Sequence, residues 1–243
     1  MVDKETHWDN VYQGQNIQAP YLEAPYLDHP VFIAALEHFG GSVSNRRLLD
    51  LGCGLGTASL FFAEHGASVT SVDTSAAAIS TLRAYCIEHG ISNIEPILMP
   101  AANITDIGPF DFIFGSMILH HIEPFTELAS GLRAGLLPEG KAFFYENSAT
   151  SSLLMWFRNH VIGKLGVPKY GDEEESPLSG SEIKTLADHF HVEIIYPEFV
   201  FFRLIPIYLL GGRWQRPFRQ LDDLLYAVPY LRQYSYRQYI LLS

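Results

Sequence analysis

The chain has 243 residues, of which 48% are apolar, and this is long and apolar enough for a globular fold with a substantial core. Its net charge of −11 repels phosphate backbones, so the composition disfavours a nucleic-acid partner. The two cysteines, Cys53 and Cys86, form no CxxC pair, which argues against a zinc site and against a disulfide framework.

The chain opens with a short helical segment that contains Trp8 and Tyr12. These aromatic residues are four positions apart and therefore share one face of a helix. The first residues contain no apolar run typical of a signal peptide, and no apolar stretch is long enough to span a bilayer. We therefore expect a cytoplasmic protein.

From residue 46 onward, short apolar runs alternate with amphipathic segments, which predicts strands separated by helices. Strands are expected over 47–51, 68–72, 94–98, 110–114, 141–145, 192–200 and 234–242. Helices are expected over 57–65, 76–88, 124–136, 181–190 and 221–227, with Ser75 and Ser181 as N-caps. Pro96 predicts an edge or irregular strand. The alternation implies an α/β fold with a mostly parallel, seven-stranded sheet and helices on both faces.

Two segments interrupt this alternation. Residues 148–180 contain an apolar and aromatic stretch followed by a polar loop, and residues 201–233 form an aromatic-rich helical insertion before the last strand. No internal repeat is present. We therefore expect one domain over residues 1–243 with two embellishments.

A glycine-rich loop carries the strongest functional signal. Asp50-Leu51-Gly52-Cys53-Gly54-Leu55-Gly56 follows the first strand and opens a helix. Glycines allow a tight turn and a close approach to a ligand, and ligands of parallel sheets bind at the carboxyl ends of the strands. Asp73 ends the next strand, where an acid can accept both hydrogen bonds of a ribose diol. The G-x-G-x-G spacing and the anion at Asp50 favour a nucleoside that bears a cationic amino acid over a dinucleotide.

These motifs resemble those of the class I S-adenosylmethionine (SAM)-dependent methyltransferases over about residues 28–147. The resemblance implies a Rossmann-like fold, SAM as the cofactor and a methyl-transfer enzyme. It also implies that the glycines pack against the amino-acid portion of SAM, that Asp50 orients the amine, and that Asp73 and Thr74 hold the ribose. Residues 110–122 are similar to the fourth motif of the family, which places Ser116 at the loop that closes over methionine.

The third motif departs from the family pattern, because Pro100 stands where an acid is common. The resemblance then leaves backbone groups of Ala101 and Ala102 to bind adenine, with Asn103 as a substitute for the acid. In the family, an aromatic N-terminal helix often folds over SAM, so residues 1–40 are expected to form lid helices; simple packing explains Trp8 and Tyr12 equally well. The expected cofactor-binding residues are Tyr12, Asp50, Gly52, Cys53, Gly54, Gly56, Asp73, Thr74, Ala101, Ala102 and Ser116.

Two adjacent histidines follow the fourth strand. An imidazole can take a proton from a hydroxyl group near neutral pH, and we expect His120 to be this catalytic base. The resemblance favours a structural role for His121. Related ubiquinone-type O-methyltransferases carry metal-binding carboxylates in this segment, where this chain has Met117 and His120, so no metal site is expected.

Direct methyl transfer needs positioning and not a protein nucleophile, so the acceptor is recognised by the lining of the site. The aromatic residues of 153–167 and 199–230, including Tyr208 and Trp214, predict a wall for a small apolar or aromatic acceptor that is methylated on oxygen. Several alternatives stay open. These are N-, S- or C-methylation, a non-catalytic SAM-binding partner subunit, a core or homodimer role for the aromatic segments, and a peripheral membrane contact through Arg203, Arg213 and Arg216.

Overall fold

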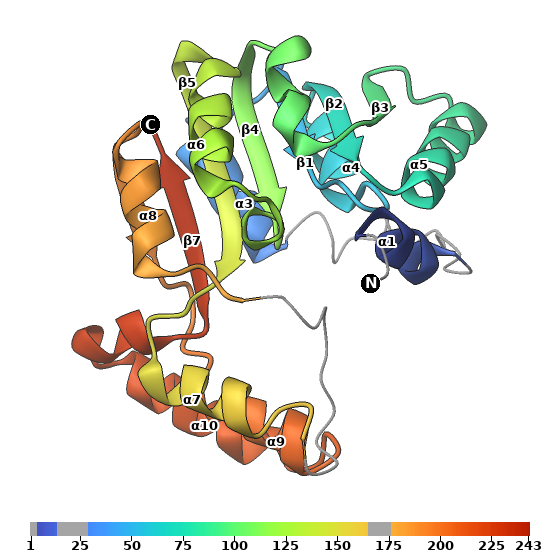
Figure 1. Cartoon of the computed structure of the whole chain (residues 1–243). Helices are drawn as coiled ribbons and strands as arrows, with labels where there is room; N and C mark the ends of the chain where they lie inside the picture. Colours follow the sequence, from blue (N-terminus) through green and yellow to red (C-terminus); the bar gives the residue numbers. More distant parts are fainter. Residues whose placement is uncertain (1–3, 14–28, 165–175) are drawn as a thin grey trace.

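The computed structural model describes residues 4–13, 29–164 and 176–243 (Figure 1). Residues 14–28 of the expected lid and residues 165–175 of the first embellishment lie outside the described residues.

The core of the molecule is a seven-stranded sheet with the strand order β3-β2-β1-β4-β5-β7-β6. Its strands are β1 (Arg47–Leu51), β2 (Ser68–Asp73), β3 (Ile94–Leu98), β4 (Phe110–Ser116), β5 (Leu136–Asn147), β6 (Val192–Ile195) and β7 (Arg237–Leu242). The first five strands pair in parallel, and β7 runs antiparallel to both β5 and β6. The predicted seven-stranded, mostly parallel α/β sheet is confirmed. The edge position expected from Pro96 is also confirmed, because β3 pairs with β2 alone.

Helices cover both faces of the sheet and enclose two cores (Figure 1). One face packs against α3 (Pro30–His38), α4 (Thr57–Glu64) and α5 (Ala76–His89); the other packs against η2 (Ala101–Asp106), α6 (Phe125–Ala134) and α8 (Gly180–Ala187). Phe143 and Phe144 show how one strand serves both cores. They are consecutive on β5 and fully buried on opposite faces. Each such side chain contributes about 1.5–3 kcal/mol through burial.

Local signals set some helix ends correctly and others incorrectly. Ser75 caps α5 as predicted, since its hydroxyl accepts a hydrogen bond from the amide of Ala78 at 3.2 Å. Ser181 is not the cap of α8. Ser179 takes that place in a capping box with Glu182, which satisfies two backbone donors reciprocally, and Ser181 lies inside the helix.

The last two strands are shorter than predicted. β6 ends at Ile195, two residues before Pro197, whose nitrogen cannot donate to a sheet ladder. β7 begins only at Arg237, because the preceding residues form the 3-10 helix η4 (Pro229–Tyr234).

The insertion before the last strand is helical, as expected. We use the term C-terminal lobe for α7 (Ser152–His160), α9 (Leu204–Leu209), α10 (Gln215–Tyr226) and η4 together. The lobe lies beyond the carboxyl end of β5 (Figure 1). A small core of Leu154, Val200 and Tyr236 holds it together. No helix in the described part of the chain is long and apolar enough to cross a membrane.

Candidate active site

A cavity of about 490 Å³ lies at the carboxyl ends of β1, β2 and β4, beside α1 (Lys4–Tyr12). In the sheet, β2 lies on one side of β1 and β4 lies on the other, so the strand order reverses at β1. Ligands of open α/β sheets bind at such a switch point. The volume falls within the range of small-molecule sites. The wall is formed by Trp8, Tyr12, Leu51, Gly52, Val72, Asp73, Thr74, Met99, Pro100, Ala101, Ala102, Ser116, Met117, Ile118, His121, Ile122 and Glu123.

The glycine loop begins at the wall of the cavity, and its backbone adopts conformations that side chains disfavour. Gly52 and Gly54 have φ values of 68° and 50°. A Cβ atom at Gly52 would lie 2.6 Å from Ile118, and one at Gly54 would lie 2.7 Å from the hydroxyl oxygen of Tyr12. Gly52 lines the cavity, whereas Cys53, Gly54 and Gly56 are not among its lining residues.

Asp73 lies where the sequence predicted, at the end of β2 and on the cavity wall. Its Oδ2 accepts a hydrogen bond from the Gly54 amide at 2.8 Å, and its Oδ1 accepts one from the Ser75 amide at 2.9 Å. Burial raises the pKa of this carboxyl, while these backbone donors oppose the shift. Each carboxylate oxygen has a second lone pair that is available to a hydroxyl of a ligand.

Asp50, which we expected to orient the amine of the cofactor, is not among the residues that line the cavity. Its side chain is buried on the α4 face of β1, where Oδ2 accepts a hydrogen bond from the Ser59 hydroxyl at 2.5 Å. Ser71 on β2 in turn donates to Ser59 at 2.7 Å. Burial raises the pKa of Asp50 to about 7. Side chains alternate along a strand, and Leu51, not Asp50, reaches the cavity.

The departure in the third motif leaves an apolar wall. Met99, Pro100, Ala101 and Ala102 all line the cavity, at the start of the short helix η2. Asn103 is exposed and does not belong to the wall, so the structure does not support it as a substitute for the missing acid.

A buried carboxylate shapes the opposite wall. Met117 has a left-handed φ of 54° and turns the chain sharply after β4. This turn directs the amides of Ile118 and Leu119 toward Oε1 of Glu146, at 2.8 and 2.7 Å. Glu146 is fully buried on β5. It thereby fixes the segment that carries Ser116 and both histidines.

The two histidines lie in different surroundings, and the one predicted to be the base, His120, is not on the cavity wall. The side chain of His120 is 2% exposed, and its Nδ1 lies 2.6 Å from Oε2 of Glu146. His121 instead lines the cavity, with its ring 4.1 Å from that of His120 and 5.2 Å from that of Trp8. The contact with the buried Glu146 holds the side chain of His120 away from the cavity. Within the described ranges, no three His, Cys, Asp or Glu side chains are arranged to hold a metal ion.

Helix α1 supplies an aromatic side to the cavity. Trp8 and Tyr12 both line it, with ring centroids 6.1 Å apart. The helix is tied to the start of α5 by Asp9, whose Oδ1 accepts hydrogen bonds from the Ser75 hydroxyl at 2.7 Å and the Ala77 amide at 3.1 Å. These bonds, the one from Ser75 above all, lower the pKa of Asp9.

The C-terminal lobe contributes none of the described residues of the cavity wall. Trp214 is 73% exposed, and Tyr208 packs inside the lobe beside Leu154 and Leu204. The prediction that these aromatic residues form the acceptor wall is therefore not supported by the shape of the cavity.

Sequence reasoning missed several residues of the site. Glu146 carries no local signal, because its partners lie 26 to 28 positions away. Trp8 was recognised as a helix-face partner of Tyr12 but not assigned to the ligand. Glu123 also lines the cavity, although its carboxylate accepts a hydrogen bond from the Phe125 amide at 2.9 Å.

The wall fits a nucleoside cofactor that carries an amino acid. Asp73 offers partly buried acceptors to a ribose, and residues 99–102 offer an apolar surface to a flat base. At Gly52 a side chain would clash with Ile118, so a ligand meets the backbone there. Together, the fold and this wall define an α/β enzyme of the nucleoside-cofactor class.

Comparison with known proteins identifies the family. The family model for a methyltransferase domain matches residues 27–190. That is well over half of the chain, so the chain belongs to this family. It is a class I SAM-dependent methyltransferase, and SAM is its cofactor.

The curated relatives are similar at a modest level. The ubiquinone biosynthesis O-methyltransferase of Idiomarina loihiensis is 28% identical over 165 residues, which cover 66% of this chain and 67% of the relative. The enzyme of the same name from Nitrosococcus oceani is 31% identical over 104 residues, which cover 42% and 44%. The chain thus spans about two thirds of the length of the first relative and less than half of the second.

Solved structures share the fold. A SAM-dependent methyltransferase from Archaeoglobus fulgidus superposes with a TM-score of 0.57 at 16% identity, covering 99% of both chains. At this level of identity, the similarity establishes the fold alone.

Proposed function

We propose that this protein transfers the methyl group of SAM to a hydroxyl oxygen of a small apolar or aromatic acceptor. The observation that carries the proposal is the cavity itself, whose wall includes Asp73, Gly52 and an imidazole, that of His121. The residues proposed to bind the nucleoside and the residue proposed to accept the proton therefore line the same cavity.

The residues of the chain bind and orient the two reactants. Asp73 and Thr74 hold the ribose, while Met99, Pro100, Ala101 and Ala102 enclose the adenine. When bound, SAM supplies an electrophilic methyl group on a sulfonium centre. The contribution of the protein is to align the acceptor oxygen with this methyl group and to exclude water, which accounts for much of the rate in such displacements.

His121 takes the role that sequence analysis gave to His120. It lies on the cavity wall between the ring of Trp8 and the ring of His120. Its imidazole accepts the acceptor's hydroxyl proton as the oxygen–carbon bond forms and the sulfur–methyl bond breaks, with S-adenosylhomocysteine as the leaving group. Glu146 and His120 act behind it as positioning residues, because their contact fixes the backbone on which His121 stands.

Two observations favour oxygen as the atom of the acceptor that is methylated. The curated relatives described above are named O-methyltransferases. An imidazole on the wall also suits an acceptor that must lose a proton.

The test is a product assay with matched acceptors. Purified protein is incubated with SAM and with a catechol, a phenol, an aromatic amine and an aromatic thiol, and methylated products are identified by mass spectrometry. We expect turnover of a hydroxylated compound and binding of SAM and S-adenosylhomocysteine, but not NAD, by calorimetry.

Each other outcome rejects a definite part of the proposal. Methylation of only the amine or only the thiol would replace oxygen as the acceptor atom. SAM binding without turnover of any acceptor in a broad metabolite extract would support a non-catalytic subunit instead.

A further inference from the structure

The C-terminal lobe exposes large apolar side chains to an unusual extent. Trp214 and Leu224 are 73% and 68% exposed, and Ile207, Leu209, Leu210, Leu221 and Val228 are each more than a third exposed. Single exposed apolar residues are ordinary, but a contiguous group marks an interaction site. We call the exposed apolar residues of α9, α10 and the turn between them the α9–α10 surface.

The spacing on α10 puts several of these residues on one stripe. Pro217, Leu221 and Leu224 are separated by four and three positions, so they follow one face of α10, and Val228 lies just beyond the end of the helix. The buried face of the same helix centres on Asp222, which accepts hydrogen bonds from the Phe202 and Arg203 amides at 2.8 and 3.1 Å. The stripe is therefore a second face that the lobe does not cover.

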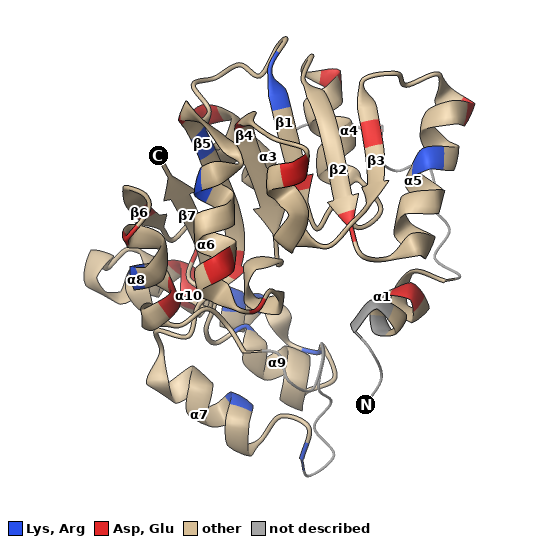
Figure 2. Cartoon of the chain, turned by 45° about the horizontal axis from the view of Figure 1, so that its top comes forward, with Lys and Arg blue, Asp and Glu red and all other residues tan. Residues whose placement is uncertain are grey.

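The charge of this region is opposite to that of the molecule. Residues 196–236 contain five arginines and three acidic residues, whereas the whole chain has a net charge of −11 (Figure 2). All three acidic residues, Glu198, Asp222 and Asp223, lie within 4 Å of Arg203.

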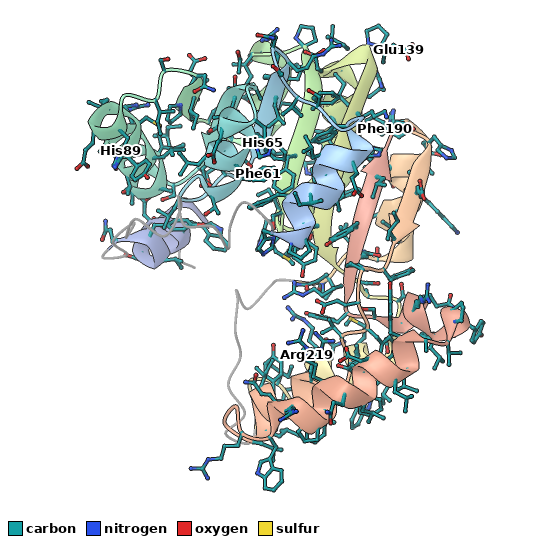
Figure 3. The ribbon with its side chains drawn as sticks, turned by 180° about the vertical axis from the view of Figure 1, so that it is seen from behind. Phe61, His65, His89, Glu139, Phe190 and Arg219 are labelled. Carbon is teal, nitrogen blue, oxygen red and sulfur yellow. The ribbon has the colours of Figure 1, made fainter. Side chains whose placement is uncertain are left out.

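Three arginines at the start of α10 are left with their charge toward solvent. Arg213, Arg216 and Arg219 are exposed, and no carboxylate of the described residues forms an ion pair with them (Figure 3 labels Arg219). The turn between α9 and α10 lies at the edge of the lobe away from the sheet (Figures 1 and 3). Arg213 and Trp214 are part of this turn, so a cation and an indole are presented together at the margin of the molecule.

We propose that the α9–α10 surface docks the protein onto an anionic lipid bilayer. Leucines on one helical stripe, a tryptophan at the margin and arginines beside it form the combination that binds in the interface of a membrane. A second copy of the chain is a poorer occupant, because a twofold contact would place two surfaces of like charge against each other. The proposal does not depend on which acceptor is methylated.

The test measures binding to vesicles without SAM or acceptor, so its failure would leave the methyl-transfer proposal untouched. Purified protein is sedimented with vesicles of phosphatidylglycerol and phosphatidylcholine, and separately with vesicles of phosphatidylcholine alone. We expect binding to the anionic vesicles only, with an affinity that falls as salt is raised.

Two variants and one control assign the binding to this surface. Leu224→Glu and the double change Arg213→Glu with Arg216→Glu should each weaken vesicle binding by about tenfold or more. Ile87→Glu is the matched control, because Ile87 is 77% exposed on α5, outside the lobe, and should bind as the unaltered protein does. Thermal melting shows that each variant is folded.

Two results would overturn the proposal. One is the absence of binding to anionic vesicles, or equal loss of binding in Ile87→Glu and Leu224→Glu. The other is a dimer, seen by light scattering, that Leu224→Glu converts to a monomer while no vesicle is bound, since the surface would then join two copies of the chain.

Discussion

The cofactor cavity and the C-terminal lobe both lie at the carboxyl edge of one sheet, yet they differ in which side chains are buried and which are exposed. Around the cavity, carboxylates are hydrogen-bonded and withdrawn from solvent: Asp50 and Glu146 are buried, and Asp73 is partly buried. In the lobe, large apolar side chains such as Trp214 and Leu224 are exposed.

This difference shows which residues indicate a ligand. A buried carboxylate is costly unless it has hydrogen-bond donors, so its position is tightly specified and informative. Aromatic residues in an insertion have several uses, including a core, an interface and a wall. The aromatic content of the lobe therefore predicts less about the acceptor than one aspartate predicts about the cofactor.

The largest expected effect is at His121, which lies on the cavity wall, and it distinguishes His121 from His120, which contacts Glu146. His121→Ala should lower the rate of methyl transfer roughly 10²–10⁴-fold while SAM affinity is kept, because the acceptor would lose its proton acceptor. Single-turnover kinetics and calorimetry measure the two quantities. Full activity in His121→Ala, with loss of activity in a folded His120→Ala, would restore the assignment made from sequence.

The next effect concerns Asp73 and the cofactor. Asp73→Ala should weaken SAM binding by about 1.5–3 kcal/mol, the range for a hydrogen bond to a charged group. Calorimetry gives the affinity directly. Asp106→Ala is the control, since Asp106 is an exposed acid on η2 away from the cavity wall. Equal affinity in both variants would contradict the role of Asp73.

For Asp50 we expect an effect on the pH dependence of folding stability, not on cofactor binding. Its pKa is raised to about 7 by burial. Between the ordinary value near 4 and this value, the folded state holds a proton that the unfolded state releases, so this carboxyl makes the protein less stable as pH rises through that window. In Asp50→Asn that dependence is absent.

The stability of Asp50→Asn relative to the unaltered apo protein should therefore rise by on the order of 1 kcal/mol per pH unit between pH 5 and 7. Urea unfolding at several pH values measures it. A constant difference across this range would mean that Asp50 ionises normally in the folded protein.

A smaller effect is expected at Asp9, which ties α1 to α5. Asp9→Ala should weaken SAM binding a few-fold, because the helix that carries Trp8 and Tyr12 would lose its two hydrogen bonds to Ser75 and Ala77. Asn10→Ala, an exposed neighbour on the same helix, is the control. An unchanged affinity in Asp9→Ala would show that other contacts hold α1.

The smallest effect is expected in the lobe. Trp214→Ala should change neither the SAM affinity nor the KM of a water-soluble acceptor by more than about twofold, because its side chain is remote from the cavity wall. Tyr208→Ala should lower the melting temperature, since Tyr208, on α9, lies beside Leu154 and Phe157 of α7. A large rise in acceptor KM in either variant would show that the lobe forms the acceptor wall after all.

Many features of this protein could be predicted from its sequence. The strand and helix order, the glycine loop and Asp73 followed from apolar periodicity and from the position of turn residues, which act over a few neighbouring residues. The edge position of β3 followed from a single proline, Pro96. These features are local, so the sequence by itself determined the fold class, the cofactor class and the edge of the sheet where the cofactor binds.

The direction of individual side chains was decided only by the tertiary structure. Asp50 turns to the hydroxyl of Ser59 on α4, and His120 turns to Glu146, 26 positions along the chain. Adjacent histidines, or an acid beside a glycine loop, have no local preference for one side of the wall. Their orientation depends on which distant group satisfies a buried polar atom, and that pairing exists only once the strands and helices have packed.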